Sequence, residues 1–432
     1  MEEDAKIYKL AKDYRIVRIK GNKCSLFFKN RQNQLLASLE GCSNTFTQIN
    51  IASDKKLSEI EKAYLLSFVK AKKYTMSKEV AATLGVSVIK YLDGREEYFS
   101  ERRFKRRVER GLDFARVYAA DVSAHSLTIA PDSKDCFYDL THANISKLVV
   151  SENATVNIDL RDNTFIESVV VGDKFSGTIN LSRSSVESVF IGNNCHCHLT
   201  IADAKKCFNL QIADIYSGNL NVSNSCLYAF GLGYYSYADL ILSNNIIKKG
   251  IEIGDSFRGN FYALNQNVDV FKVGDDCKGT VKVSDQGSET GVKKLIVGDD
   301  FSGVLNLSGD ESLKVVEVGR KNGGRIDASL TPNLERMSVG KYFNGNVNLS
   351  SSAVQNIFVA YGASGCFDLT DSNRLGQVHA TIDNHLIFNG ISPVSTETAD
   401  GSVYYRFASF VTRVSDIPFY QKIYQTIQNH FH

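Results

Sequence analysis

The segment NCHCH at 194–198 places four potential metal ligands side by side. Thiolate and imidazole groups are the ligands that zinc prefers, usually in tetrahedral sets of four. In a strand, however, Cys195 and Cys197 would lie on one face and His196 and His198 on the other, so one ion held by all four requires a bulge. The alternative is that Cys195 is a core residue, because equivalent positions of a repeat in this chain hold Phe175, Phe257, Cys277, Phe301 and Phe343.

A second group of candidate residues consists of acids that follow glycines spaced 20 to 24 residues apart. If the chain stacks at that period, the acids lie within a few ångströms of one another, where like charges repel unless a cation or a basic group joins them. The hypotheses are a Ca²⁺ site, the acid pair of a β-helical polysaccharide lyase or hydrolase, or a solvated turn neutralised by Arg320, Lys321 and Lys341. We favour the turn, because this position is polar in most copies. The acids are Asp255, Asp275, Asp276, Asp299 and Asp300, with Glu252 nearby.

The elements that position these residues come from a repeat of 20 or 21 residues. Each copy reads φ-x-x-φ-x-φ-G-x-x-F-x-G-x-φ-x-φ-S, where φ is apolar, as in VVVGDKFSGTINLS at 169–182. Apolar residues at alternate positions predict strands, and the glycines provide tight turns. Stacked copies can bury an apolar face that one copy cannot. The anchoring position holds Gly172, Gly192, Gly233, Gly254, Gly274, Gly298, Gly319 and Gly340, with Ser151, Ala213 and Ala360 as substitutes, and only the interval from Gly274 to Gly298 is as long as 24 residues.

The repeat predicts a mainly β protein with a parallel β-solenoid of eleven or twelve rungs, either a β-helix or a leucine-rich-repeat-like array. A twelfth, degenerate copy lies around LTIAPDSKDCFYDLT. At the spacing of neighbouring strands, eleven rungs make a rod of roughly 50 Å. The φ-x-x-φ-x-φ half resembles leucine-rich repeats, FSGTINLS resembles the second strand of such repeats, and the Gly-punctuated strand pairs are similar to bactofilins, the bacterial β-helical scaffold proteins. The consensus Asn of leucine-rich repeats is missing, and the rungs are longer than those of bactofilins. The resemblance implies the architecture and a role in binding or scaffolding.

Two outward columns of the predicted rungs differ in polarity. The column in the first strand mixes polar residues such as Gln211, Glu252, Lys272 and Glu317 with apolar ones, which a solvent-facing sheet should not carry. This mixture predicts a face covered by a partner or by a terminal domain, with Val170, Phe190, Ile296 and Phe358 as contact residues. The column in the second strand is polar, and its amides are expected to stack on one another: Asn180, Asn221, Asn306 and Asn348, with Asp327 and Asp368.

The first part of the chain differs from the repeats in composition. Residues 1–120 hold 25 Lys and Arg against 15 Asp and Glu, whereas the remainder holds 25 against 33. Such an asymmetry indicates an anionic partner for the basic part, which we expect to be a small α+β domain over 1–115. The segment TMSKEVAATLGVSVIKYL resembles a helix-turn-helix of the small excisionase kind at 75–94, although IKYLDGREEYF also fits a hairpin turning at Asp93-Gly94.

The basic run RRFKRRVER at 102–110 would contact phosphates if this domain binds DNA. The alternative, which we favour, is a capping domain on which the run forms a solvated helix face or docks on the acidic solenoid. The residues concerned are Arg102, Arg103, Lys105, Arg106, Arg107 and Arg110.

The remaining features concern the chain ends and its environment. Repeats are expected over 116–371, and a C-terminal cap over 372–432 with a helix at 417–431, for which binding to a partner is the alternative role. The apolar face of this helix holds Ile417, Tyr420, Ile423, Tyr424, Ile427 and Phe431. The N-terminus lacks a secretory signal, no run of 18 apolar residues occurs, and nine Cys without framework spacing suit a reducing compartment. We therefore expect a cytoplasmic protein, with non-classical export left open, and no cofactor.

These features together predict a non-enzymatic repeat protein that binds a protein partner through the solenoid face and acts as a scaffold. Two alternatives remain at this point: a polysaccharide lyase or hydrolase, and a DNA-associated protein that oligomerises by stacking its solenoid.

Overall fold

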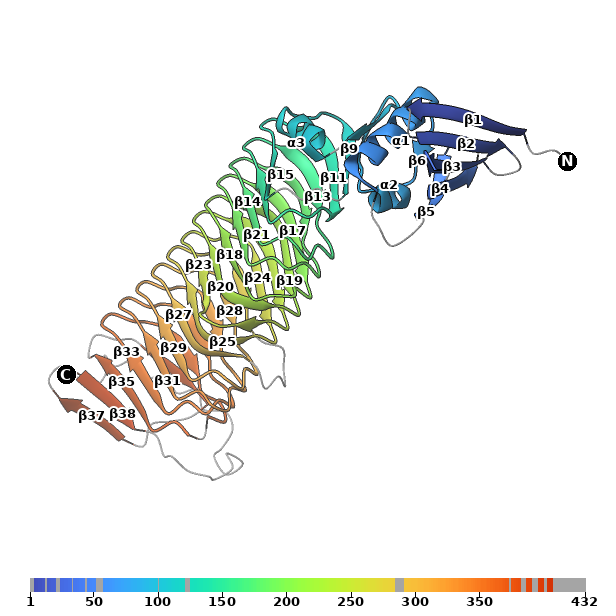
Figure 1. Ribbon diagram of the computed structural model, residues 1–432. Helices are drawn as coiled ribbons and strands as arrows, with labels where there is room; N and C mark the ends of the chain where they lie inside the picture. The colour runs from blue at the N-terminus through green and yellow to red at the C-terminus, as the bar shows by residue number, and fades with distance from the viewer. Residues whose placement is uncertain are drawn as a thin grey trace. The chain divides into compact units, whose positions relative to one another are not determined.

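The computed structural model describes residues 4–11, 14–20, 24–32, 34–42, 45–51, 57–99, 101–120, 125–283, 291–372, 374–381, 386–390, 395–399 and 402–406. It confirms the predicted fold, a mainly β protein built on a stacked parallel β-solenoid of about 12 turns (Figure 1). The chain divides into two compact units, residues 1–169 with 176–180 and residues 170–175 with 181–432.

The first unit begins with a mostly antiparallel sheet that shares a core with two helices. Ser58 starts the first helix with a capping box, in which its hydroxyl accepts the Glu61 amide while the Glu61 carboxylate accepts the Ser58 amide. Apolar residues of sheet and helices form one core that includes Phe28, Phe46 and Leu65, all at most 1% exposed. The elements are β1 (Asp4–Ala11), β2 (Tyr14–Lys20), β3 (Cys24–Asn30), β4 (Leu35–Cys42), β5 (Thr45–Ile51), α1 (Glu59–Ala71), β6 (Thr75–Met76) and α2 (Lys78–Leu84).

The structure does not contain the second helix of the helix-turn-helix predicted at 75–94. The first helix, α2, is present and ends at Gly85 in the left-handed conformation, with φ 64°. The chain then forms β7 (Ser87–Tyr91), which pairs antiparallel with β8 (Glu96–Phe99) around the Asp93-Gly94 turn. The β-branched pair Val88-Ile89 is buried in this hairpin and favours a strand. The hairpin, which was the alternative interpretation of the segment, is therefore correct.

The hairpin continues into the first rungs of the solenoid. Strand β7 also pairs antiparallel with β9, and β9 pairs in parallel with β11, so antiparallel strands end the sheet on this side. The degenerate copy of the repeat supplies β10 and β11 and is a complete rung. One sheet of this unit holds β9 (Ala115–Ala120), β11 (Lys134–His142), β13 (Thr155–Asp159) and β15 (Ser176–Asn180), the other holds β10 (Ser126–Ile129) and β12 (Lys147–Val150), and β14 (Ser168–Val171) spans the boundary of the two units.

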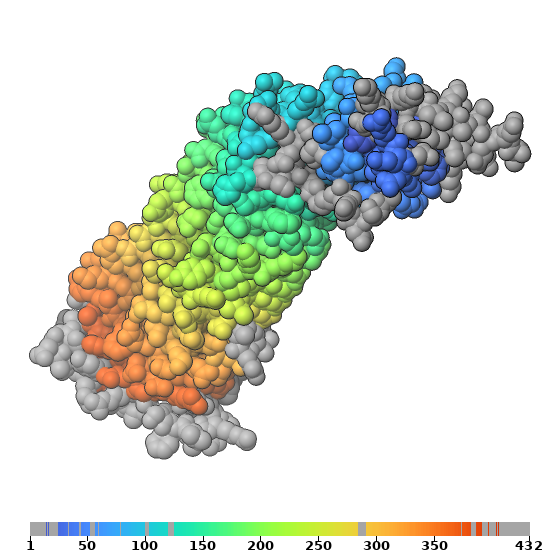
Figure 2. Space-filling model, viewed as in Figure 1, coloured from blue at the N-terminus to red at the C-terminus, as the bar shows by residue number. Residues whose placement is uncertain are grey.

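The second unit continues with rungs in which each strand pairs with its equivalent one rung later (Figure 1). Figure 2 shows these successive rungs, green to orange, packed against one another over the visible face. The first sheet contains β16 (Ser188–Ile191), β18 (Phe208–Ile212), β20 (Cys226–Leu232), β22 (Ile246–Ile247), β23 (Ile251–Ile253), β25 (Asn267–Val273), β27 (Val292–Val297), β29 (Val315–Val318), β31 (Arg336–Val339), β33 (Asn356–Val359) and β35 (Gln377–Thr381). The second sheet contains β17 (His196–Ala202), β19 (Ser217–Ser223), β21 (Tyr237–Ser243), β24 (Asn260–Leu264), β26 (Thr280–Lys282), β28 (Val304–Asn306), β30 (Arg325–Asp327), β32 (Asn346–Asn348), β34 (Cys366–Asp368) and β36 (Ile387–Asn389).

Two tight corners join the strands of each rung, and both use the left-handed backbone region. The second residue after the anchoring Gly has φ between 50° and 59° in ten successive rungs, mostly at Asn, Asp, Ser or Lys. Short polar side chains tolerate this region better than branched or bulky ones. We call this turn the first corner; its left-handed residues are Asn153, Lys174, Asn194, Ile215, Tyr235, Ser256, Asp276, Asp300, Lys321 and Tyr342.

One rung departs from the predicted core. The position six residues before Ala213 is Cys207, which the repeat assigns to the core, but Cys207 is only half-buried. Phe208 is fully buried instead and pairs with Leu227, because the register shifts by one residue between Phe208 and Asn209. Cys207 forms a disulfide with Cys226 of the next rung.

The C-terminal end of the first sheet is also closed by antiparallel strands. Strand β38 (Ser402–Arg406) pairs antiparallel with β35 and with β37 (Ser395–Ala399). Val403 and Tyr405 are each 2% exposed, so the hairpin contributes apolar cover to the last rungs. The helix predicted at 417–431 lies outside the described residues. Within the described ranges, the helices are too short or too polar to cross a membrane.

Candidate interaction surface

The carboxylates of the first corner form a ladder of backbone caps. Asp255 accepts the amide of Asp275 at 2.9 Å, and Asp275 accepts the amide of Asp299 at 2.7 Å. Asp299 in turn accepts the amide of Arg320 at 2.7 Å and its guanidinium Nε at 2.8 Å. These hydrogen bonds from Arg320 hold the pKa of Asp299 below its usual value. Each carboxylate therefore accepts an amide of the next rung, and Arg320 is paired with Asp299.

The other two acids of this group lie in left-handed corner positions. Asp276 is 3.5 Å from both the Arg258 and the Lys278 side chains, and Asp300 donates its amide to the Arg320 carbonyl. In the described part of the chain, no three His, Cys, Asp or Glu side chains are grouped as a metal site. The Ca²⁺ hypothesis for Asp255, Asp275, Asp276, Asp299 and Asp300 thus gains no support from their arrangement.

The NCHCH segment has the alternation expected of a strand. Cys195 and Cys197 are fully buried, and His196 and His198 of β17 are exposed on the opposite face. A four-ligand site is therefore not formed, because the two thiols and the two imidazoles point away from each other.

The outward column of the first sheet is in register but its apolar members are far apart. Phe190 and Phe358 are 42% and 40% exposed, whereas Val170 and Ile296 are half-buried. From Phe190 to Phe358 the column passes through Gln211, Gly231, Glu252, Lys272, Ile296, Glu317 and Ser338.

Charged residues separate the apolar members of this column in its later rungs. The Glu317 carboxylate lies 2.8 Å from Lys294 and 2.7 Å from Arg336, which hold the pKa of Glu317 below its usual value. The predicted contact residues are therefore single apolar side chains on a polar sheet rather than one continuous surface.

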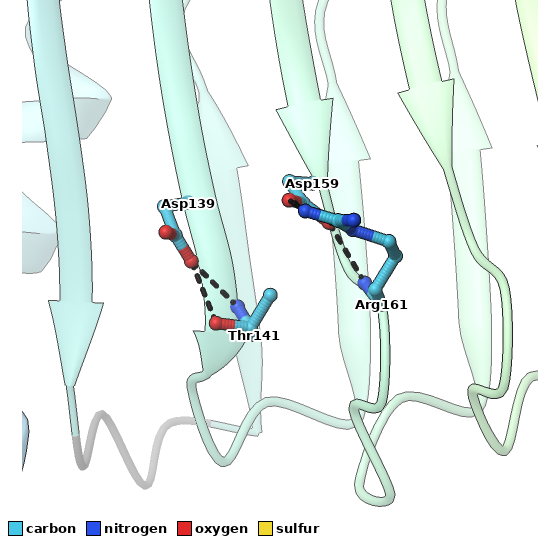
Figure 3. Close-up of polar contacts among 4 residues, drawn as sticks. All are labelled: Asp139, Thr141, Asp159 and Arg161. Atoms are coloured by element: carbon cyan, nitrogen blue, oxygen red, sulfur yellow. Dashed lines mark hydrogen bonds and ion pairs between the residues drawn. The ribbon is translucent and has the colours of Figure 1, made fainter.

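The polar column of the second sheet caps the second corner of six rungs in the described part of the chain. Asp139 accepts the amide and the hydroxyl of Thr141, and Asp159 accepts the amide and the guanidinium of Arg161 (Figure 3). The same bond, from a side chain to the amide two residues later, recurs at Asn306, Asp327, Asn348 and Asp368. Asn348 also donates to Asp327 of the preceding rung at 3.1 Å. This column serves the fold and needs no ligand.

The basic run lies on helix α3 (Glu101–Glu109), which packs on β8 and β10. Phe104 and Val108 are fully buried, one turn apart, so the helix docks through its apolar face. Arg107 donates to the Gly111 carbonyl at 2.8 Å, and Lys105 lies 3.9 Å from Glu109. Three of the six predicted residues, Arg103, Arg106 and Arg110, are exposed, and they follow each other at helical spacing. The side chain of Arg102 is outside the described part of the structure.

A group of four large exposed side chains in two neighbouring rungs was not predicted. Ile215, Tyr234, Tyr235 and Tyr237 are 46%, 50%, 61% and 58% exposed. They occupy the first corners of two consecutive rungs, where the Ile215 amide donates to the Tyr234 carbonyl at 2.8 Å. Tyr237 pairs with Ser217 at the start of the second sheet. We call these four residues the tyrosine edge.

A signal for the tyrosine edge was present in the sequence. The corner reads GYYSY at 233–237, whereas the equivalent five residues elsewhere include GDKFS, GDSFR and GDDFS. Aligning the copies by position, rather than by their apolar pattern, reveals tyrosine at the places of the usual acid and of the left-handed residue.

Comparisons with known proteins found no significant match to a family model, to a curated protein or to a solved structure.

Proposed function

We propose that this protein is a non-enzymatic scaffold whose solenoid binds a protein partner through the tyrosine edge. The observation that carries the proposal is Ile215, which is 46% exposed and has φ 59°. A β-branched residue in the left-handed region is strained, and its exposure to water recovers no burial energy in return. Equivalent corners hold Asn153 and Asn194, which avoid both costs. A contact made by the Ile215 side chain with a partner would explain why the position is apolar.

The three tyrosines suit the same role. Tyrosine supplies a large, rigid and amphipathic contact area with few rotatable bonds, and it is enriched in protein interfaces. Tyr235 and Tyr237 are the most exposed members, and Tyr234 donates its amide to Asp214, which positions the corner. The solenoid beneath is cross-linked by hydrogen bonds in every rung, so the edge is presented on a rigid support and little ordering is needed on binding.

The polysaccharide-cleaving alternative receives less support. Its two proposed acids, Asp275 and Asp299, are engaged by amides of the next rung, and Asp299 is also paired with Arg320. An acid catalyst needs a carboxyl group whose pKa is raised, whereas the pKa of Asp299 is lowered.

Changing Ile215 and Tyr235 together to Asn is expected to abolish capture of the partner while stabilising the protein by about 1 kcal/mol, because Asn tolerates the left-handed corner. The matched control is Tyr342→Asn, which changes the equivalent corner residue of another rung, 51% exposed. Proteins captured by the wild-type chain from the native lysate are identified, and each is tested again with both variants.

A partner that binds wild type and Tyr342→Asn equally but not Ile215→Asn/Tyr235→Asn supports the proposal. Equal capture by all three chains contradicts it. Cleavage of a polysaccharide that Asp275→Asn or Asp299→Asn abolishes would instead establish the enzymatic alternative.

A further inference from the structure

His196 and His198 are successive outward residues of β17, and both are exposed. Their ring centroids lie 5.5 Å apart, with the ring planes at 77°. An ion bound tetrahedrally by one nitrogen of each ring, at about 2.1 Å, would place the two centroids roughly 5 Å apart. The separation of the two ring centroids is therefore close to that of two imidazoles that share one tetrahedral ion.

The hydroxyl of Ser217 in the next rung orients the first of these rings. It lies 3.1 Å from Nδ1 of His196 and donates to the Cys195 carbonyl at 3.4 Å. When the hydroxyl donates to that carbonyl, it accepts the Nδ1 proton of His196. In this tautomer Nε2 carries the free lone pair and is the nitrogen that can bind a metal. A histidine ligand whose other nitrogen is held by a hydrogen bond is the usual arrangement in metal sites.

The neighbouring thiols are not available as ligands. Cys195 and Cys197 alternate with the two histidines and are fully buried on the core side. The accessible ligand set consists of two imidazoles, which suits ions of the borderline class, such as Zn²⁺, Ni²⁺ and Cu²⁺.

We propose that His196 and His198 form a surface chelate for a borderline divalent transition-metal ion, with Ser217 as a positioning residue and the remaining coordination positions open to water or to an external ligand. This proposal does not depend on the role of the tyrosine edge. The two features are nevertheless neighbours, because His196, Ser217 and Tyr237 occupy one position in three consecutive rungs, about 10 Å from first to last. A side chain from a molecule bound at that edge could reach an open coordination position.

The test is calorimetric titration of the full chain with ZnCl₂ at pH 7.5 in a buffer that does not bind metals. The C-terminal segment His430-Phe431-His432 repeats the His-X-His spacing, so the titration is done in the His430→Gln/His432→Gln background as well as in the wild type. In this background we expect one Zn²⁺ per chain. His196→Gln or His198→Gln should weaken binding at least about tenfold, Ser217→Ala about tenfold, and His379→Gln not at all.

One further readout separates this site from adventitious binding. Co²⁺ in place of Zn²⁺ should give a ligand-field absorption spectrum without thiolate-to-metal charge transfer, since no cysteine takes part. Absence of binding in the background variant, or binding that survives the His196→Gln/His198→Gln change, overturns the proposal.

Discussion

Replacing Gly324 by alanine is expected to lower the free energy of unfolding by about 3 kcal/mol. The added methyl group overpacks a rigid core, and the surrounding atoms cannot move far enough to relieve the strain. A Cβ atom at this position would lie 2.5 Å from the Gly303 carbonyl oxygen of the preceding rung and 2.7 Å from Cε1 of Phe301. The oxygen belongs to the backbone, and Phe301 is a core residue only 1% exposed. The conflict is therefore relieved only by separating two rungs.

The matched control for this change is Gly376→Ala. A Cβ atom at Gly376 would contact only the Gln355 carbonyl oxygen, at 3.6 Å, so we expect a change within about 0.5 kcal/mol. Urea unfolding of the three chains, followed by tyrosine fluorescence because the protein lacks tryptophan, measures the difference. Equal stability of Gly324→Ala and wild type would mean that the contact between these rungs is looser than the structure has it.

The Asp310→Asn variant and the wild type differ in their free energies of unfolding, and this difference is expected to depend on pH. Between pH 4 and pH 8 it should change by about 2 to 3 kcal/mol in favour of the variant. Asp310 is fully buried at the second corner of its rung, and burial raises its pKa to about 6. Amides of Val292 and Ser312 donate to its two oxygens, at 3.0 and 2.8 Å, which offsets part of this effect. An asparagine does not titrate, so the pH dependence due to this group disappears in the variant.

The direction of the pH effect follows from the raised pKa of Asp310. Below about pH 4 the Asp310 carboxyl group is protonated in both the folded and the unfolded chain, so its full contribution to the stability of the wild type is present. As the pH rises from about 4 through the folded value of about 6, the unfolded chain ionises more readily, so the wild type loses stability. Urea unfolding of both chains at pH 4, 6 and 8 tests this, because other groups cancel in the difference. A difference that is constant with pH would show that Asp310 ionises normally in the folded chain.

The choice of aspartate at this corner has a structural explanation. In the equivalent corner, Asn163 accepts the amides of Phe165 and Ile166 and donates to the carbonyls of Leu140 and Ala143. Asp310 instead meets the amide of Val292 from the preceding rung, so it must accept on both sides. Asparagine has a single side-chain oxygen, so its NH₂ group would face one of the two amides, those of Val292 and Ser312, that donate to Asp310. The loss of one hydrogen bond therefore lowers the stability of the variant at every pH.

The sequence was sufficient to predict the solenoid because each rung repeats the same inward positions at a nearly constant spacing. The alternation that buries Cys195 and Cys197 and exposes His196 and His198 follows from strand geometry alone, and it was predicted. The assignment of Cys207 to the core was wrong, since a one-residue register shift puts Phe208 there. A register shift of this kind leaves the spacing of the anchoring residues unchanged, so that spacing cannot reveal it.

The candidate site was harder to predict, for two physical reasons. The role of Asp255, Asp275 and Asp299 depends on the backbone conformation of the first corner. This conformation directs each carboxylate to an amide of the next rung rather than to the neighbouring carboxylate. The helix-turn-helix prediction failed because α2 and Gly85 are common to both interpretations, and only the tertiary pairing of β7 with β8 and β9 makes the segment after Gly85 a strand rather than a helix.

The long interval between Gly274 and Gly298 has a consequence for how such a chain can change over generations. Strand pairs on both sides of it stay in register, with Val268 opposite Val292 and Val281 opposite Leu305, although this rung is longer than its neighbours. Both sheets thus keep their register across an interval that is longer than its neighbours. A change in the length of one repeat therefore need not propagate to the rungs before and after it, so single repeats can diverge in length while the array is retained.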